Sequence, residues 1–254
     1  MVWLALLLLG VAVVDLVRGR WSAPVVPELV GALVVPLLGV LVGAGPRDIV
    51  VLLGASAVVV AWSLAVRRAT GHAGGTGDTD RPVDAALALT VLAVGVTLAL
   101  LLSPLADEVA GPFRRWAAAL PWDAAADDPD RLLMVAAVAA VQLSTANLVV
   151  RLVLGATRTA APQLVDSAEH PAVELKGGRL LGPMERLVIL GLGLAGEVTA
   201  ASIVIAAKGL LRWPELSSRR EQVAIHALTE YFLVGSFVSW SLALGSLALV
   251  ASAG

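Results

Sequence analysis

Three ionisable residues in the C-terminal third of the chain, Arg186, Glu197 and Lys208, follow one another at intervals of 11 residues. Eleven residues make almost three full turns of an α-helix, so we expect the three side chains on one helix face. Ionisable groups at membrane depth are costly and persist where a helix bundle compensates for them. The spacing predicts a polar intramembrane stripe of Arg186, Glu197, Lys208 and Arg212 that faces the bundle interior.

Glu197 is the residue of this stripe with the clearest candidate chemistry. It lies 12 residues after Glu185 and 11 before Lys208, about 16–18 Å from each end of the expected helix. That depth is close to the bilayer midplane, and we interpret Glu197 as a candidate for proton or cation handling. The alternative is a neutral Glu that only hydrogen-bonds between helices, because burial favours the uncharged form of a carboxyl group.

Other polar residues are expected around this stripe. Gln142 and Ser239 lie near the midpoints of the two neighbouring apolar segments, at the depth expected for Glu197. Asn147 and Arg151 share a helix face with Ser144, at spacings of i, i+3 and i+7. These residues are the candidate neighbours of the stripe.

Two ion pairs are expected at the helix ends, because an unpaired buried charge is strongly destabilising. Helix order should bring Glu185 to Arg151, and a hairpin turn should bring Glu230 to Lys208 or Arg212. The alternative interpretation is that these charges only fix helix register or extend toward water.

Familiar motifs of enzymes and of metal sites fail on context. Gly191, Gly193 and Gly196 match G-x-G-x-x-G, but no strand precedes them, so close helix packing is the better interpretation. His226 and Glu230 are spaced as two metal ligands on one helix face, without a third ligand. We therefore predict no metal site and no cofactor, and favour a protein without enzymatic activity. A membrane enzyme acting on lipid is the remaining catalytic alternative.

Composition indicates whether the chain lies in water or in a membrane. The 254 residues are 58% hydrophobic and 15% charged, against about 25% charged in soluble domains. The charge-free runs are apolar on all sides, as helices in lipid must be. A net charge of −2 gives no indication of a nucleic-acid partner. We expect a multi-pass protein of the cell membrane, in contact with membrane lipid. The Ala-, Val- and Leu-rich composition favours a bacterial inner membrane.

The predicted fold class is all-α, a single polytopic membrane domain over 1–254 with about seven transmembrane helices, in a range of six to eight, and no β-sheet. Residues 104–130 contain interleaved Arg and Trp and predict a short helix at the membrane interface. The expected transmembrane segments are 2–17, 29–44, 49–66, 84–103, 131–154, 184–207 and 227–250.

The last two segments are expected to form a helical hairpin. Trp213-Pro214 should end one helix, and Ser218 and Glu221 fit a capping box that begins the next. With seven crossings, the Lys and Arg residues of the connections divide eight against eight between the two sides. Arg151 and Arg186 tip this balance and favour an outer N-terminus and an inner C-terminus.

The C-terminal part also resembles a known family. The residues that carry the likeness, over roughly 178–245, are Gly178-Arg-Leu-Leu-Gly-Pro-Met-Glu185-Arg186, Gly196-Glu197, Ala206-Ala207-Lys208, Leu211-Arg212, Glu230-Tyr231, Leu233-Val-Gly235-Ser236 and Ser239. This pattern resembles a bacterial integral-membrane family catalogued as domain of unknown function 3307. Members tend to have Gln where this chain has Glu197, and the N-terminal half diverges. The resemblance implies a membrane location and the polar stripe, but no activity.

Two functions compete on these observations. In the first, the protein is a small channel or carrier, and the stripe lines a polar path between the last helices. In the second, it is a structural or regulatory membrane subunit without transport or catalytic activity. Its buried charges then fix packing or dock a partner protein or a second copy. A water-filled cavity at the stripe would favour the first, and a dry interface would favour the second.

Overall fold

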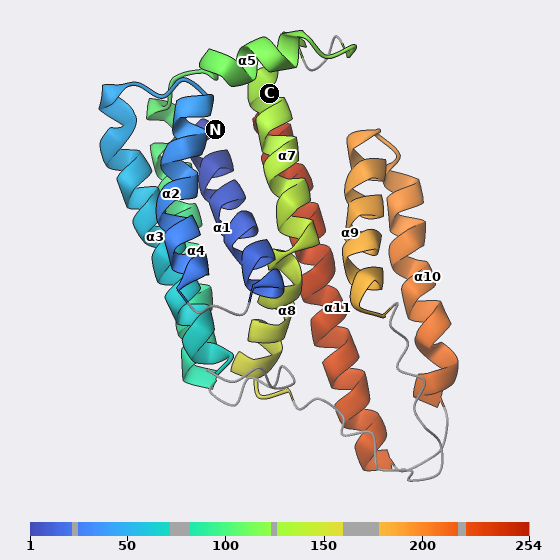
Figure 1. Ribbon diagram of the computed structural model, residues 1–254. Coiled ribbons are helices and arrows are strands. Elements are labelled where there is room, and N and C mark those ends of the chain that lie inside the picture. The colour runs from blue at the N-terminus through green and yellow to red at the C-terminus, as the bar shows by residue number, and fades with distance from the viewer. Residues whose placement is uncertain (22–24, 72–81, 123–125, 160–177, 218–221, 254) are drawn as a thin grey trace.

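The protein is built from helices that run mostly along one axis (Figure 1). The computed structural model describes residues 1–21, 25–71, 82–122, 126–159, 178–217 and 222–253, and these contain no strand. The all-α prediction is therefore confirmed for the described chain. The helices are α1 (Val2–Arg20), α2 (Val26–Leu41), α3 (Ile49–Ala69), α4 (Pro82–Leu102), α5 (Gly111–Ala118), α7 (Pro129–Leu143), α8 (Thr145–Ala156), α9 (Gly178–Leu194), α10 (Val198–Ser217) and α11 (Gln222–Ala251).

Helix α1 is the centre of the N-terminal half. It packs against α2, α3, α4, α7 and α8, and Leu4, Val11 and Val14 on it are fully buried. Its side chains are apolar on every side up to Asp15. Other helices can therefore surround it without burying a polar side chain. By contrast, α4 lies at the outside of the bundle, and Val94, Leu98 and Leu101 are exposed on it. Such exposed apolar faces are those that lipid would cover.

Four segments are long and apolar enough to cross a membrane, namely Val2–Arg20, Pro46–Ala69, Pro82–Leu105 and Thr229–Ala251. The bent pair α7 and α8 makes a fifth if it is counted as one span. The described chain is therefore a polytopic helical membrane protein. The seven expected spans differ from this count because α2 has only 16 residues and because the segment 184–207 is broken.

The expected helix 131–154 is broken in the middle. α7 ends at Leu143, α8 begins at Thr145, and their axes differ by 51°. Ser144 lies between them, and its hydroxyl donates to the backbone carbonyl oxygens of Ala140 and Ala12. A side chain that bonds to the carbonyl of the preceding turn bends a helix, and the bond to α1 fixes the bend in place.

The expected helix 184–207 is also wrong as a single element. α9 ends at Leu194, α10 begins at Val198, and Gly196 between them has a φ of +82°. α10 turns back along α9, so the two form a hairpin (Figure 1). Glycine adopts positive φ without steric cost, which explains why an apolar run without a charge before Glu197 reverses here.

The predicted end of the segment before Trp213-Pro214 and the predicted separation of the chain termini are both corrected. α10 continues through Trp213 and Pro214 to Ser217, about one turn beyond the predicted end, so Pro214 lies in its last turn. The capping box of Ser218 and Glu221 lies outside the described residues. Both chain termini lie at the same end of the bundle (Figure 1), whereas seven alternating passes would have separated them.

The predicted short helix in 104–130 is confirmed as α5, which lies across the end of the bundle that carries both termini (Figure 1). Phe113 and Ala117 on it are buried, while Arg114, Arg115 and Trp116 are exposed. Its connection to α2 is close, since Ala110 N donates to Val42 O at 2.8 Å. Gly43 and Gly111 approach each other there, and both have positive φ.

Candidate functional site at the break between α7 and α8

Arg186 of α9 is a large charged side chain in the bundle interior, with 2% of its surface exposed. Its Nη2 donates to the backbone oxygen of Gln142 and to Oδ1 of Asn147, each at 2.8 Å. Its Nη1 donates to Oγ of Ser239 on α11 at 3.3 Å. The last carbonyl groups of a helix have no intrahelical donor, so the guanidinium supplies one to the broken end of α7.

Gln142 ties the same break to α11. Its Nε2 donates to the backbone oxygen of Leu242 at 3.1 Å and to Oγ of Ser246 at 2.7 Å. Its side chain is fully buried. Two buried polar atoms of this cluster, Oε1 of Gln142 and Nε of Arg186, have no partner. Each could bond to a water molecule or to a small polar ligand. The residues Arg186, Gln142, Asn147, Ser239 and Ser246 are called the Arg186 cluster below.

A carboxylate faces the other half of the broken span. Asp15 of α1 accepts hydrogen bonds from Oγ1 of Thr145 at 2.7 Å and from Nε1 of Trp62 at 3.2 Å. Thr145 is the first residue of α8, and Trp62 of α3 is fully buried. Asp15, Trp62 and Thr145 are called the Asp15 cluster below.

The two clusters match the electrostatics of the helix ends that they face. The start of α8 carries the positive end of a helix dipole, and it meets Asp15. The end of α7 carries the negative end, and it meets Arg186. Discontinuous transmembrane helices whose half-helix ends bind charged groups are a recurring form of the substrate and ion sites in membrane carriers. The break is thus the place where the interior of this protein could bind or release a charge.

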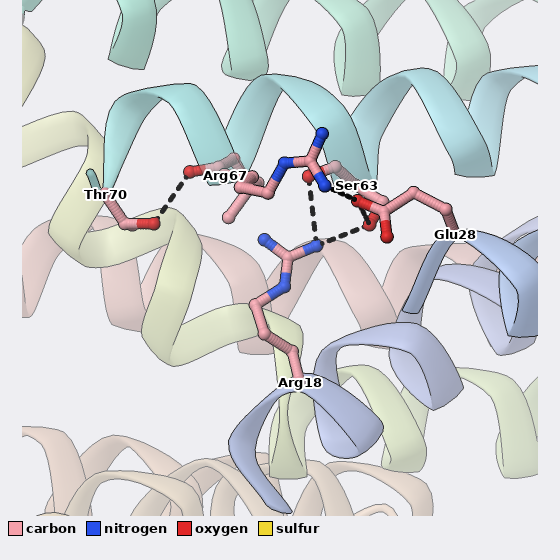
Figure 2. Close-up of polar contacts among 6 residues, drawn as sticks. Arg18, Glu28, Ser63, Arg67 and Thr70 are labelled. Carbon is pink, nitrogen blue, oxygen red and sulfur yellow. Dashed lines mark hydrogen bonds and ion pairs between the residues drawn. The ribbon is translucent and has the colours of Figure 1, made fainter. Parts of the chain in front are cut away.

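A third polar group continues from the Asp15 cluster toward the end of the bundle opposite the termini. Figure 2 shows Arg18 and Arg67 reaching toward Ser63 and Glu28. Nη2 of Arg18 donates to Oγ of Ser63 at 2.8 Å and to its backbone oxygen at 3.2 Å. Nη1 of Arg67 lies 3.1 Å from Oε1 of Glu28. Since Ser63 follows Trp62 directly, the two groups share α3. Nε and Nη1 of Arg18 are buried without a partner.

Four residues of the expected site are brought together by the structure. Gln142 and Ser239 were expected beside Glu197, and Asn147 was expected as a further neighbour of the stripe, but all three surround Arg186 instead. The reason is the break after Leu194, which removes Glu197 from the helix that carries Arg186. The stripe of Arg186, Glu197, Lys208 and Arg212 on one helix face is therefore wrong as a geometric expectation. Glu197 is exposed in the turn between α9 and α10.

The expected end pairs have mixed outcomes. Glu185 accepts a hydrogen bond from Nε1 of Trp240 at 3.2 Å, while Arg151 is exposed on α8, and their ion pair stays a prediction. Glu230 is exposed on α11. The side chains of Lys208 and Arg212 lie outside the described residues, so the pair with Glu230 also stays a prediction.

Sequence reasoning missed the Asp15 cluster. The spacing of Asp15 and Arg18 favours a local i, i+3 pair, whereas Asp15 contacts α3 and α8 across 47 and 130 residues of sequence. The available signal was a carboxylate within an otherwise apolar span. Among the described residues, no group of three or more His, Asp or Glu side chains is placed to hold a metal ion.

No protein family, curated protein or solved structure matches the chain. The resemblance to domain of unknown function 3307 therefore stays a prediction.

Proposed function

We propose that this protein is a small proton-coupled membrane carrier, in which the break between α7 and α8 is the moving part and Asp15 is the group that binds the proton. The observation that carries the proposal is that Asp15 contacts the start of α8 and Arg186 contacts the end of α7, the two helix ends that meet at the break. Ionisable residues inside a membrane bundle generally mark ion or proton pathways. The expected proton site at Glu197 moves to Asp15, because Glu197 lies in an exposed turn.

The proposed cycle depends on the charge of Asp15. An ionised Asp15 attracts the start of α8 and accepts the hydrogen bond of Thr145. A protonated Asp15 loses most of that attraction, so α8 gains freedom to change its angle to α7. The polar Arg186 cluster, with two buried atoms free to bond, would then open to a polar substrate. A conformational change follows only from such a difference in binding between two states.

The second candidate function is a structural or regulatory membrane subunit that binds a partner protein or a second copy. The observation that favours it is the dense packing of the break, where Gln142, Thr145 and Arg186 are all nearly inaccessible. A buried polar network of this kind also serves to fix helix register without any transport. The two functions differ in whether water ever reaches the break.

The absence of cysteine from the chain allows a direct test. A single cysteine is introduced as Ser246→Cys, beside Gln142 in the break. The protein is reconstituted in liposomes, and a membrane-impermeant thiol reagent is added from either side between about pH 5 and pH 8. A carrier predicts labelling whose side changes with pH, because protonation of Asp15 moves the break. Asp15→Asn in the same background should abolish that pH dependence.

The matched control is Ser56→Cys on α3. Ser56 is buried like Ser246, but its hydroxyl bonds only to its own helix, through Leu52 O. It should stay unlabelled at every pH. If Ser246→Cys also stays unlabelled from both sides at every pH, the break is static, and the subunit function replaces the carrier.

A further inference from the structure

The two ends of the bundle differ strongly in basic residues. α1 and α3 both end at the end opposite the chain termini, where Arg18 contacts Ser63 and Arg67 contacts Glu28 (Figure 2). α8 ends, α9 begins and α10 ends at that same end (Figure 1). The basic residues in these terminal turns or directly beside them are Arg18, Arg20, Arg67, Arg68, Arg158, Arg179 and Arg212. We call this end the arginine-rich end.

The end with both termini carries fewer basic residues. Around η1 (Pro46–Asp48), along α5 and at the start of α7 they are Arg47, Arg114, Arg115 and Arg131. In the sequence alone, the segments that join α3 to α4, α8 to α9 and α10 to α11 contain the further basic residues Arg81, Lys176, Arg219 and Arg220.

The hairpin of α9 and α10 is the reason for this imbalance. With one helix over 184–207, Arg212, Arg219 and Arg220 would lie on the side of Arg114 and Arg115, and the two sides would balance. Because the chain reverses at Gly196, α10 returns toward the side of Arg18 and Arg67 and carries Arg212 with it. Short cytoplasmic connections carry an excess of Lys and Arg, and acidic residues contribute little to this rule.

We propose that the arginine-rich end faces the cytoplasm, against the anionic headgroups of the inner leaflet, and that both chain termini lie outside. This assignment replaces the expected inner C-terminus, and it is independent of the proposed carrier function. Arg20 and Arg68 are exposed at this end, and the side chain of Trp21, which follows Arg20 in the sequence, is 61% exposed. Trp residues prefer the interface, and basic residues next to a span are attracted to anionic lipids.

The absence of cysteine also makes this proposal testable on the full chain. Gly19→Cys reports on the arginine-rich end, where an added Cβ meets nothing within 4 Å. Ala251→Cys reports on the opposite end, in an exposed position. Each variant is produced in a bacterial host, and spheroplasts are treated with a membrane-impermeant maleimide before and after permeabilisation. We expect Ala251→Cys to react in sealed spheroplasts, and Gly19→Cys to react at least tenfold more after permeabilisation.

A second matched pair tests whether two positions at the same end of the bundle lie on the same side of the membrane. Ala118→Cys on α5 should follow Ala251→Cys, and Thr157→Cys after α8 should follow Gly19→Cys, since all four positions are exposed. Reaction of Gly19→Cys and Thr157→Cys in sealed spheroplasts would overturn the orientation. Protection of Ala251→Cys until permeabilisation would overturn it as well.

Discussion

The guanidinium of Arg186 and the backbone oxygen of Gln142 lie 2.8 Å apart, joining two residues that are 44 positions apart in the sequence. This hydrogen bond gives a donor to a carbonyl group that the end of α7 leaves without one. It links α9 to the broken span, and the bonds from Arg186 to Asn147 and Ser239 extend the link to α8 and α11. One side chain therefore joins α7, α8, α9 and α11.

Arg186→Lys should destabilise the protein by about 1–3 kcal/mol. Lysine keeps the positive charge but donates from a single nitrogen, so it cannot reproduce the contacts that Arg186 makes from two separate nitrogens. The measurement is the free energy of unfolding in detergent by titration with a denaturing detergent. Arg131→Lys, at an exposed position at the start of α7, is the control and should leave stability unchanged. Equal stability of the two variants would mean that the Arg186 bonds contribute nothing net.

Thr145→Val should remove the hydroxyl that donates to Asp15 while keeping the side-chain shape. Hydrogen bonds to charged groups contribute about 1.5–3 kcal/mol, and we expect a loss of that size. Thr145→Ser should retain most of the stability. Thr157→Val serves as the control, because the exposed Thr157 hydroxyl bonds only to nearby residues. A Thr145→Val protein as stable as Thr145→Ser would contradict the bond to Asp15.

Gly193→Ala should weaken the packing of α9 on α11. A Cβ at this position would overlap Cδ1 of Leu247, so the helices must separate or Leu247 must change rotamer. Overpacking of this kind costs about 1–3 kcal/mol. Gly191→Ala is a matched control two residues away, where a Cβ would meet nothing within 4 Å. In thermal unfolding, the midpoint of Gly191→Ala should be at or above that of the wild type, because alanine has a higher helix propensity than glycine.

Gly196→Ala distinguishes a hairpin from a continuous helix by the sign of its effect. In the hairpin, Gly196 has a φ of +82°, and alanine there costs about 1–2 kcal/mol. In a continuous helix the same change would stabilise the protein by about 0.5–1 kcal/mol. Hydrogen exchange of the backbone amides in α9 and α10 would detect either outcome. Slower exchange in the variant would mean that the chain does not reverse at Gly196.

The sequence by itself determined the helical class and the main polar residues of the interior. Charge-free apolar runs can satisfy their backbone groups in a bilayer only as helices, so this inference needed no tertiary information. Gln142 and Ser239 were identified by their depth along their segments, Arg186 by its helical spacing and Asn147 by its helix face, and the four do meet. Depth sufficed for Gln142 and Ser239 because antiparallel helices of similar length bring their middles together.

Only the tertiary structure decided where the helices break and which residues face one another across the bundle. Ser144 and Gly196 are ordinary residues in apolar runs, and the bend at Ser144 is fixed by a bond to Ala12 that lies 132 positions away in the sequence. The reversal at Gly196 moved Glu197 out of the interior and moved Arg212 to the arginine-rich end. Hydropathy cannot detect such breaks, because it records the polarity of a segment and not the backbone angle of one residue.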